Sequence, residues 1–322
     1  HLNELKPMKV LVCPLNWGLG HATRCVPLVR RLLADGHEVV LVSDGFPLEF
    51  LRQQFPELRF IELPSYSIRY SAGKTQVLAM LWNLPGVISG IYKEHKWLNT
   101  LLQREHFDQV ISDNRFGLWN RKTKSIYMTH QLMIKMPLAL KWLEPLAWFL
   151  HRLLILQYDE CWIPDVAGPE NLSGDLSHKY PLSRNSRFIG PLSRFENKEA
   201  VPETNYHNVS VLSGVEPQRS IFEHELTQRF QHSHQKTLIV CGQPAAASRT
   251  YHVGDVTLVS HLPDGELASL LKGAKKIISR SGYSSIMDLK ALDCLKKAEL
   301  IPIPGQTEQE YLFELHRNRS VE

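Results

Sequence analysis

Residues 277–282 read Ile-Ile-Ser-Arg-Ser-Gly, and residues 301–309 read Ile-Pro-Ile-Pro-Gly-Gln-Thr-Glu-Gln. Each stretch is an apolar, strand-like run that breaks into a turn of small residues and then enters a helical pattern. Two consecutive strand–turn–helix units place both turns at the same edge of a parallel sheet, where open α/β sheets bind ligands. Backbone N–H groups at such turns and at helix N-termini bind phosphate, so this part of the chain predicts an anion site.

The same alternation of strands and helices runs along the whole chain and predicts an α/β protein with two Rossmann-like, doubly wound domains in series. In the first half, strands are expected at residues 9–14, 38–43, 59–63, 109–112, 125–129 and 160–163. In the second half they are expected at residues 209–212, 237–241, 257–259, 276–279 and 300–303. A polar stretch with Pro and Asn separates the two series. We therefore predict an N-terminal domain over residues 1–192, a linker over 193–208 and a C-terminal domain over 209–322.

The composition excludes several classes of protein. The 322 residues carry a formal net charge of +4, which suits anionic ligands or an anionic membrane surface but is too small to predict nucleic-acid binding. The five cysteines are scattered and form no CxxC, so neither a disulfide framework nor a zinc site is indicated, and a reduced cytoplasmic compartment is expected. A strand-like run begins almost at once, which argues against a signal peptide.

Two apolar segments leave two interpretations open. Residues 77–102 and 138–156 are rich in Leu, Trp and Ile but carry interspersed charges, and Pro145 interrupts the second segment. Neither reaches the roughly 18 consecutive apolar residues of a membrane span. The segments are expected either to pack as helices on the sheet or at the domain interface, or to form a monotopic surface that dips into a bilayer.

The loop after the first predicted strand carries a candidate for catalysis. Residues 16–21 read Asn-Trp-Gly-Leu-Gly-His, and Gly18 and Gly20 let the backbone turn tightly and approach a ligand closely. His21 stands at the predicted helix N-terminus, where the helix dipole disfavours imidazolium, so a neutral imidazole could accept a proton there. The alternative is a histidine that only caps the helix or packs against it.

Two further side chains are expected at the same edge of the sheet as His21. Asp113 follows the predicted strand at 109–112, and His130 follows the one at 125–129. Asp113 could orient the His21 ring and stabilise its protonated form, which would make His21 and Asp113 a catalytic pair. The alternatives are a turn residue for Asp113 and a loop histidine with its hydrogen bonds satisfied for His130.

The loops of the second half offer candidate ligands for a nucleotide or sugar. Arg280 combines a cation with the free N–H donors of the following turn, which suits a diphosphate, and Asp288 on the next helix could accept ribose hydroxyls. Each residue alone could be an ordinary turn or helix-surface residue, but several at one edge favour a site. The chain contains no Asp-x-Asp motif, so no metal ligand is expected. The candidates are Ser213, Gly214, Arg219, Arg280, Ser281, Gly282, Asp288, Gln306, Glu308 and Gln309.

Taken together, the Gly-x-Gly-His first loop, the Arg-Ser-Gly turn at 280–282 and the Pro-Gly-Gln-x-Glu-Gln run at 304–309 resemble the GT-B glycosyltransferases. In that fold two Rossmann-like domains face each other across a cleft. Within that fold, the chain most resembles the UDP-N-acetylglucosamine transferases of the lipid II-forming type, which have a glycosyltransferase-28-type C-terminal domain. The first loop departs from the run of Gly and Thr in that branch, and the crossover helix usual in the fold is not evident after the last motif.

The resemblance implies roles for individual residues. The first loop would face the acceptor, with His21 at the reaction centre, and the turn at 280–282 would hold the diphosphate. Asp288 would bind the ribose, the backbone near Leu262 would contact uracil, and Glu308 and Gln309 would hold hydroxyls of the donor sugar. The expected acceptor-binding residues are Gly18, Gly20, Arg24 and His130.

The function predicted is inverting, metal-independent transfer of a sugar, expected to be N-acetylglucosamine, from a UDP-sugar to an acceptor hydroxyl. The acceptor is expected to be a lipid-linked or envelope glycan, reached by peripheral contact at the inner face of the plasma membrane. No cofactor is expected beside the UDP-sugar substrate, and no nucleic acid as a partner. Two alternatives are a UDP-sugar 2-epimerase on the same fold and a non-catalytic nucleotide-sugar-binding protein.

Overall fold

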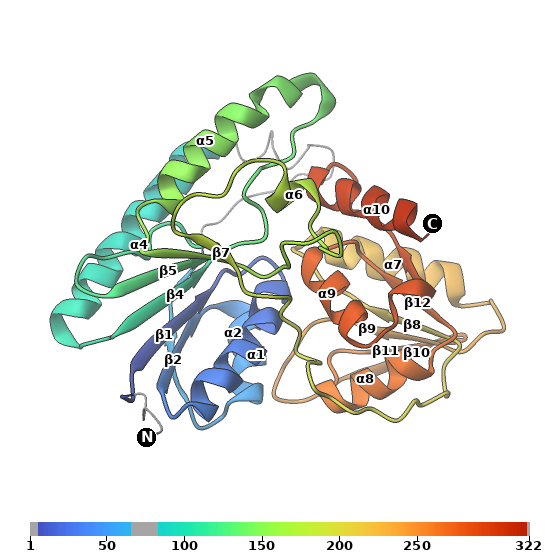
Figure 1. The fold of residues 1–322 in the computed structure, drawn as a ribbon. Helices are drawn as coiled ribbons and strands as arrows, with labels where there is room; N and C mark the ends of the chain where they lie inside the picture. Colours follow the sequence, from blue (N-terminus) through green and yellow to red (C-terminus); the bar gives the residue numbers. More distant parts are fainter. Residues whose placement is uncertain (1–5, 66–82, 321–322) are drawn as a thin grey trace.

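The structure, a computed structural model, describes residues 6–65 and 83–320. Two largely parallel sheets, each covered by helices on both faces, lie side by side and are called here the N-terminal and C-terminal domains (Figure 1). The first sheet ends at Phe188, before the predicted linker, and the second begins at Asn208, the last residue of that linker. The predicted α/β class with two doubly wound sheets is confirmed.

The N-terminal sheet has seven parallel strands in the order β3-β2-β1-β4-β5-β6-β7. β1 lies inside the sheet, between β2 and β4. The strands are β1 (Lys9–Pro14), β2 (Glu38–Ser43), β3 (Arg59–Glu62), β4 (Gln109–Asp113), β5 (Lys124–Met128), β6 (Glu160–Ile163) and β7 (Ser186–Phe188). The helices are α1 (Gly20–Ala34), α2 (Gly45–Gln54), α4 (Leu84–Arg104), η1 (Leu138–Leu143), α5 (Glu144–Ile155) and α6 (Asp175–His178).

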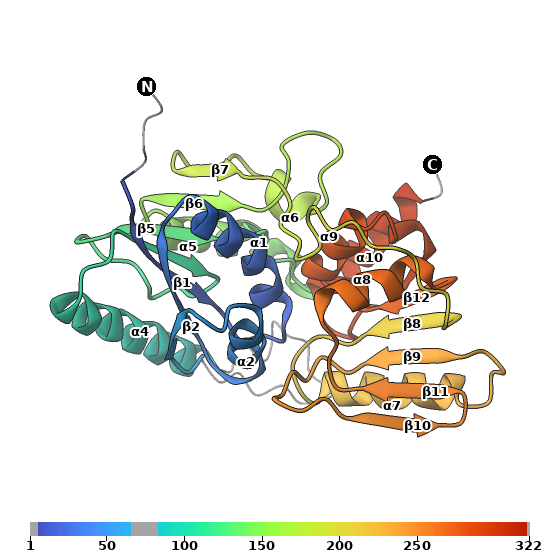
Figure 2. The ribbon, with the colours of Figure 1, turned by 90° about the horizontal axis from the view of Figure 1, so that it is seen from below.

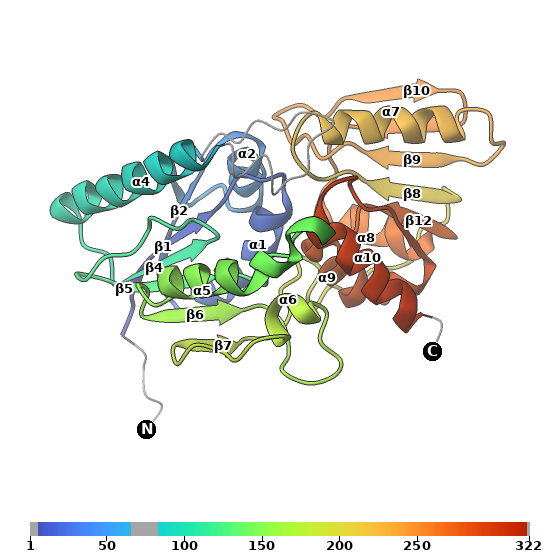
Figure 3. The same ribbon diagram turned by 90° about the horizontal axis from the view of Figure 1, so that it is seen from above.

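Alternate residues of the central strands are buried on opposite faces of this sheet. Val10 and Val12 of β1 belong to a core cluster with α1 and α2, whereas Leu11 and Cys13 pack in a cluster with Leu98 of α4. Figure 2 shows α1 and α2 on one face, and Figure 3 shows α4 and α5 on the other. A strand buried on both faces reads as a continuous apolar run, which explains why these strands could be recognised from the sequence.

The C-terminal sheet has six strands in the order β10-β11-β9-β8-β12-β13, and only the pair β10–β11 is antiparallel. Leu238 and Val240 of β9 pack in the cluster that contains α8, whereas Ile239 packs in the cluster with α7. The strands are β8 (Asn208–Val211), β9 (Thr237–Val240), β10 (Thr250–Val253), β11 (Val256–Val259), β12 (Lys276–Ser279) and β13 (Ala298–Leu300). The helices are α7 (Gln218–Phe230), α8 (Asp264–Gly273), α9 (Tyr283–Ala291), η2 (Leu295–Lys297) and α10 (Thr307–Arg319).

Some elements differ from the sequence prediction. β7 and β10 were not predicted, and β10 is an edge strand whose four residues are all exposed. The strand expected at 300–303 instead ends at Leu300, before Pro302, which has no N–H to donate to a sheet.

The two apolar segments form helices in the described part of the chain. The first corresponds to α4, its residues 77–82 lying outside the described residues, and the second to η1 and α5. None of the helices in the described residues has the length and apolar character needed to cross a membrane.

The last helix reaches back to the N-terminal domain. The hydroxyl of Tyr311 in α10 accepts a hydrogen bond from the backbone N–H of Asp175 at 2.7 Å, and Nε2 of His316 lies 2.9 Å from the carbonyl oxygen of Leu172. Leu312 packs in a shared cluster with Leu176. Contacts between the two domains at the end of the chain are therefore made by the helix of the last motif itself.

Candidate active site

A cleft between the two domains is lined by the loops that follow β1, β4 and β5 on one side and β8, β12 and β13 on the other. These are carboxyl ends of parallel strands, as expected for ligand binding. The cavity measures about 120 Å³, which is below the roughly 300–1,000 Å³ of most small-molecule sites. The two domains are in contact beside this cavity. The lining residues are Trp17, Gly20, His21, Arg24, Asn114, His130, Gln131, Ser213, Gly214, Val215, Gly282, Tyr283, Ser284, Ser285, Ile303, Gln306, Glu308 and Gln309.

His21 and Asp113, predicted as a catalytic pair, are in contact. Nδ1 of His21, in the first turn of α1, lies 3.1 Å from Oδ1 of Asp113 at the end of β4. Asp113 is fully buried, whereas His21 lines the cleft. A carboxylate only accepts hydrogen bonds, so it holds the proton on Nδ1 and leaves the lone pair on Nε2 of His21. This arrangement suits a general base.

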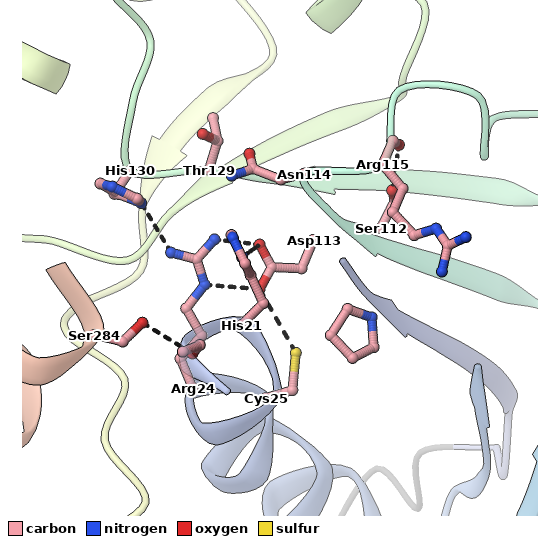
Figure 4. Close-up of polar contacts among 12 residues, drawn as sticks. His21, Arg24, Cys25, Ser112, Asp113, Asn114, Arg115, Thr129, His130 and Ser284 are labelled. Carbon is pink, nitrogen blue, oxygen red and sulfur yellow. Dashed lines mark hydrogen bonds and ion pairs between the residues drawn. The ribbon is translucent and has the colours of Figure 1, made fainter. Parts of the chain in front are cut away.

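Arg24 is the second partner of Asp113 (Figure 4). Its Nε donates to Oδ2 of Asp113 at 2.7 Å, and its Nη2 donates to Oδ1. Burial alone would raise the pKa of Asp113, but the charges of Arg24 and His21 outweigh burial and hold that pKa well below its usual range. Asp113 is therefore a carboxylate at neutral pH. Arg24 was predicted only as an acceptor-side residue; its position three residues after His21 on one helix face could have indicated the shared partner.

His130 connects the N-terminal domain to the C-terminal domain. Its Nδ1 lies 2.9 Å from Nη1 of Arg24, and its Nε2 lies 2.6 Å from Oε1 of Glu308 in α10. The imidazole ring stacks on the ring of Tyr283 in α9, with 4.3 Å between centroids and an interplanar angle of 5°. Glu308, predicted for the donor side, is thus in contact with a histidine predicted for the acceptor side.

Glycine turns of the two domains touch each other. Gly18 has φ of +72°, and a Cβ at this position would lie 2.6 Å from the backbone nitrogen of Gly214. The hydroxyl of Ser284 donates to the carbonyl oxygen of Gly20 at 2.9 Å. Glycine in the first loop is therefore required by the close approach of the turn after β8.

The turns after β8 and β12 can bind an anion. Ser213, Gly214 and Gly282 all line the cleft, as predicted. α9 begins directly after Gly282, and no side chain of the described residues caps its N-terminus. The N–H groups of its first turn are thus oriented along a helix dipole that favours negative charge. Within residues 6–65 and 83–320, no group of His, Cys, Asp and Glu side chains is arranged to hold a metal ion.

Several predicted donor-site residues do not line the cleft. The Arg280 side chain instead lies over Phe222, 3.8 Å from the ring centroid, and donates to the carbonyl oxygen of Pro302 at 3.1 Å. Burial lowers the pKa of Arg280 to about 10. Arg219 is ion-paired with Glu216 at 2.6 Å. Neither guanidinium lines the cleft in this structure, and the role of these two cations in donor binding stays a prediction. The residues outside the cleft lining are Arg219, Arg280, Ser281, Asp288 and, packed against the C-terminal core, Leu262.

Asp288 is bound by residues of the predicted linker. The hydroxyl of Ser193 donates to its Oδ1 at 2.6 Å, and Nε of Arg194 donates to Oδ2 at 3.3 Å. Burial raises the pKa of Asp288, against the effect of Arg194. A ribose at this carboxylate would have to displace or share these contacts. The hydroxyl of Ser281 donates to the carbonyl oxygen of Gln309 at 2.7 Å, so it contacts the backbone of the last motif.

The chain is similar to named glycosyltransferases over most of its length. No protein-family model matches it. An uncharacterized glycosyltransferase of Methanosarcina mazei is 24% identical over 321 residues, which cover 94% of this chain and 82% of that protein.

Solved structures show the same fold. The glycosyltransferase SnogD from Streptomyces nogalater aligns over 97% of this chain and 94% of its own, with a TM-score of 0.55 and 14% identity. A putative UDP-N-acetylglucosamine 2-epimerase from Listeria monocytogenes aligns over 98% of this chain and 89% of its own, with a TM-score of 0.53 and 12% identity. The finer resemblance to the lipid II-forming branch stays a prediction. The predicted fold and enzyme class are confirmed: the chain is an enzyme of the glycosyltransferase type with the two-domain GT-B fold.

Proposed function

We propose that this enzyme transfers a sugar from a UDP-sugar to an acceptor hydroxyl with inversion at the anomeric carbon, and that N-acetylglucosamine is the first donor sugar to test. The observation that carries the proposal is the position of His21, oriented by Asp113, across the cleft from the turns at Gly214 and Gly282. A general base on one domain and anion-binding turns on the other are what displacement of a diphosphate requires.

The chemistry follows from the hydrogen bond of His21. Nε2 of His21 accepts the proton of the acceptor hydroxyl while the acceptor oxygen attacks C1 of the donor sugar. The bond from C1 to the diphosphate oxygen breaks, and its electron pair leaves with UDP. Attack from the face opposite the leaving group inverts the anomeric carbon. Asp113, kept ionised beside Arg24, stabilises the imidazolium that forms.

We also propose that the reaction needs no metal ion. Negative charge on the departing diphosphate would be stabilised by backbone N–H groups at the N-terminus of α9 and in the turn after β8. The sequence supports this proposal because it contains no Asp-x-Asp motif to hold a divalent cation. Transfer that persists in EDTA would agree with it, and activity restored only by added Mg²⁺ or Mn²⁺ would contradict it.

Incubation with a panel of UDP-sugars, with and without a membrane lipid extract, tests the proposed reaction. UDP release that depends on the extract supports transfer. Interconversion of sugars without an acceptor would favour the 2-epimerase, and binding without turnover would favour the nucleotide-sugar-binding protein. The His21→Ala variant should still bind UDP-sugar but lose transfer. Near-normal transfer by this variant would exclude His21 as the base.

We further propose that the acceptor is lipid-linked and is reached at the cytoplasmic surface of a membrane. The support is an apolar stripe on η1 and α5, whose members recur every three or four residues and are 45–89% exposed. Lys141 and Arg152 flank the stripe, whereas Glu144 is buried and paired with Lys179. An apolar face with cations and an exposed Trp suits the interface of an anionic bilayer. The stripe consists of Leu138, Trp142, Leu146, Phe149, Leu150 and Leu153.

Flotation with vesicles tests this surface. The protein should bind vesicles that contain phosphatidylglycerol more tightly than neutral ones, and Trp142→Ala should weaken binding about tenfold because a large apolar side chain is lost from the interface. Tyr251→Ala, which removes an exposed aromatic ring from β10 of the other domain, is the matched control. If the Trp142→Ala and Tyr251→Ala variants bind vesicles equally well, the stripe is not the membrane-binding surface.

A further inference from the structure

Five side chains form one continuous hydrogen-bonded series from the base to the last helix. Arg24, Asp113 and His130 in the middle of the series are all at most 6% exposed. The first member belongs to α1 and the last to α10, so the series crosses from one domain to the other. The members in order are His21, Asp113, Arg24, His130 and Glu308.

The direction of each hydrogen bond in this series follows from chemistry. A guanidinium only donates, so Nδ1 of His130 must accept from Arg24 and carry no proton. The remaining proton of His130 therefore sits on Nε2 and is donated to Oε1 of Glu308 at 2.6 Å. Burial lowers the pKa of His130 against the opposing effect of Glu308, in agreement with a neutral ring. The structure thus assigns the Nε2–H tautomer.

The contacts of Glu308 and Gln309 also determine which of their hydrogen-bonding atoms remain available to a ligand. Oε1 of Gln309 accepts from the backbone N–H of Ile303 at 3.0 Å, which leaves the amide N–H groups of Gln309 as donors. Oε1 of Glu308 is taken by His130, and its Oε2 has no hydrogen-bond partner among the described residues. The pair therefore presents a carboxylate oxygen that accepts and an amide group that donates, which suits a sugar with two neighbouring polar substituents, of which the one at Glu308 is a hydroxyl.

The series also balances charge when the base works. It holds two carboxylates against one guanidinium, so it has one negative charge in excess while both histidines are neutral. The proton that His21 takes from an acceptor offsets that excess.

We propose that His130, held by Arg24, is a positioning residue that sets Glu308 for the donor sugar. His130 belongs to the loop after β5, and Glu308 lies in the first turn of α10, where the hydroxyl of Thr307 also donates to the carbonyl oxygen of Lys135. The kinetic part of this inference rests on the proposed function.

The His130→Phe variant tests this role because it keeps a flat ring against Tyr283 and removes both hydrogen bonds. It should lower kcat/KM for the donor about 10- to 100-fold, the effect of a lost hydrogen bond to a charged group, with most of the change in the donor KM. Glu308→Gln should have a similar effect, and the double variant should be no worse than the poorer single one. Independent, multiplying effects, or a rise confined to the acceptor KM, would overturn the inference.

Two further variants separate positioning from mere stability. His130→Gln retains an amide N–H that can donate to Glu308. It should recover at least about a tenth of the kcat/KM for the donor that is lost in His130→Phe. His151→Phe is the matched control, because His151 is equally buried and bonded through both ring nitrogens but does not line the cleft. It should destabilise the protein and leave the donor KM unchanged. Loss of donor affinity in this control would assign the His130 effect to stability.

Imidazole ¹⁵N chemical shifts test the series without any substrate. The His130 resonances are assigned as those that disappear from the spectrum of the His130→Phe variant. In the wild-type protein their shifts should indicate a proton on Nε2 and none on Nδ1. A proton on Nδ1, or an averaged tautomer, would refute the series whether or not sugar is transferred. Absence of transfer by a protein with the expected tautomer would instead refute the proposed function alone.

Discussion

Replacement of Gly18 by alanine tests whether the two domains meet as closely as the structure shows. The new Cβ would lie 2.6 Å from the nitrogen and 2.8 Å from Cα of Gly214, both backbone atoms that cannot rotate away. The separation from the nitrogen is about 0.8 Å short of the 3.4 Å at which ordinary contact begins. Gly18→Ala should therefore hold the first loop away from the turn after β8.

The expected magnitude has two parts. A non-glycine residue at φ of +72° costs roughly 1–2 kcal/mol of stability wherever it occurs. Displacing the loop that carries His21 by about 0.8 Å should in addition reduce kcat/KM on the order of 100-fold, because misplacement of about 1 Å has that effect on reacting groups. Gly36→Ala separates the two parts, since Gly36 has φ of +79° and nothing within 4 Å of the added Cβ.

The assay measures urea unfolding and donor-dependent UDP release for both variants. Gly36→Ala should lose stability and keep its activity, whereas Gly18→Ala should lose both. If the two variants lose the same stability and both retain normal kcat/KM, the close contact between Gly18 and Gly214 does not occur in the working enzyme.

Two other predictions concern charge. Asp113→Asn should lower the free energy of unfolding at pH 7 by about 3–5 kcal/mol, because it leaves Arg24 buried without its carboxylate; a loss below 1 kcal/mol in urea titration would contradict the buried pair. Burial, aided by Arg194, lowers the pKa of His261 to about 4. Between about pH 6.5 and pH 4 the unfolded chain therefore binds a proton at His261 that the folded protein does not. The free energy of unfolding should be unaffected by His261 above about pH 6.5 and should fall by up to about 3 kcal/mol toward pH 4. His261→Gln should flatten that part of the stability–pH curve, and an unchanged curve would contradict the assignment.

Much of the site could be predicted because it depends on strand ends. A parallel strand buried on both faces is a continuous apolar run, and the residue after it must lie at the carboxyl edge of the sheet. That reasoning placed His21, Asp113 and His130 at one edge; His21 contacts Asp113 directly, and Arg24 connects Asp113 to His130. It did not pair Arg24 with Asp113, although Arg24 lies three residues after His21 on the same face of α1.

Side-chain direction limited the prediction in the C-terminal domain. Arg280 follows β12 at the expected edge, yet its guanidinium turns to the ring of Phe222 in α7, a partner 58 residues earlier in the chain. Asp288 likewise is hydrogen-bonded to Ser193 and Arg194 of the predicted linker. Local sequence gives the position of a residue on its element but not the packing partners that choose its rotamer.

The sequence by itself determined the two-sheet architecture, the glycine turns at the strand ends and the edge at which the candidate base stands, since these depend on apolar periodicity and on backbone rules that act over a few residues. Only the tertiary structure decided that Gly18 touches Gly214, that His130 reaches Glu308 and that Arg280 is withdrawn into the core. Each of these contacts joins residues far apart along the chain, and their geometry is set by how helices and domains pack, which local periodicity does not contain.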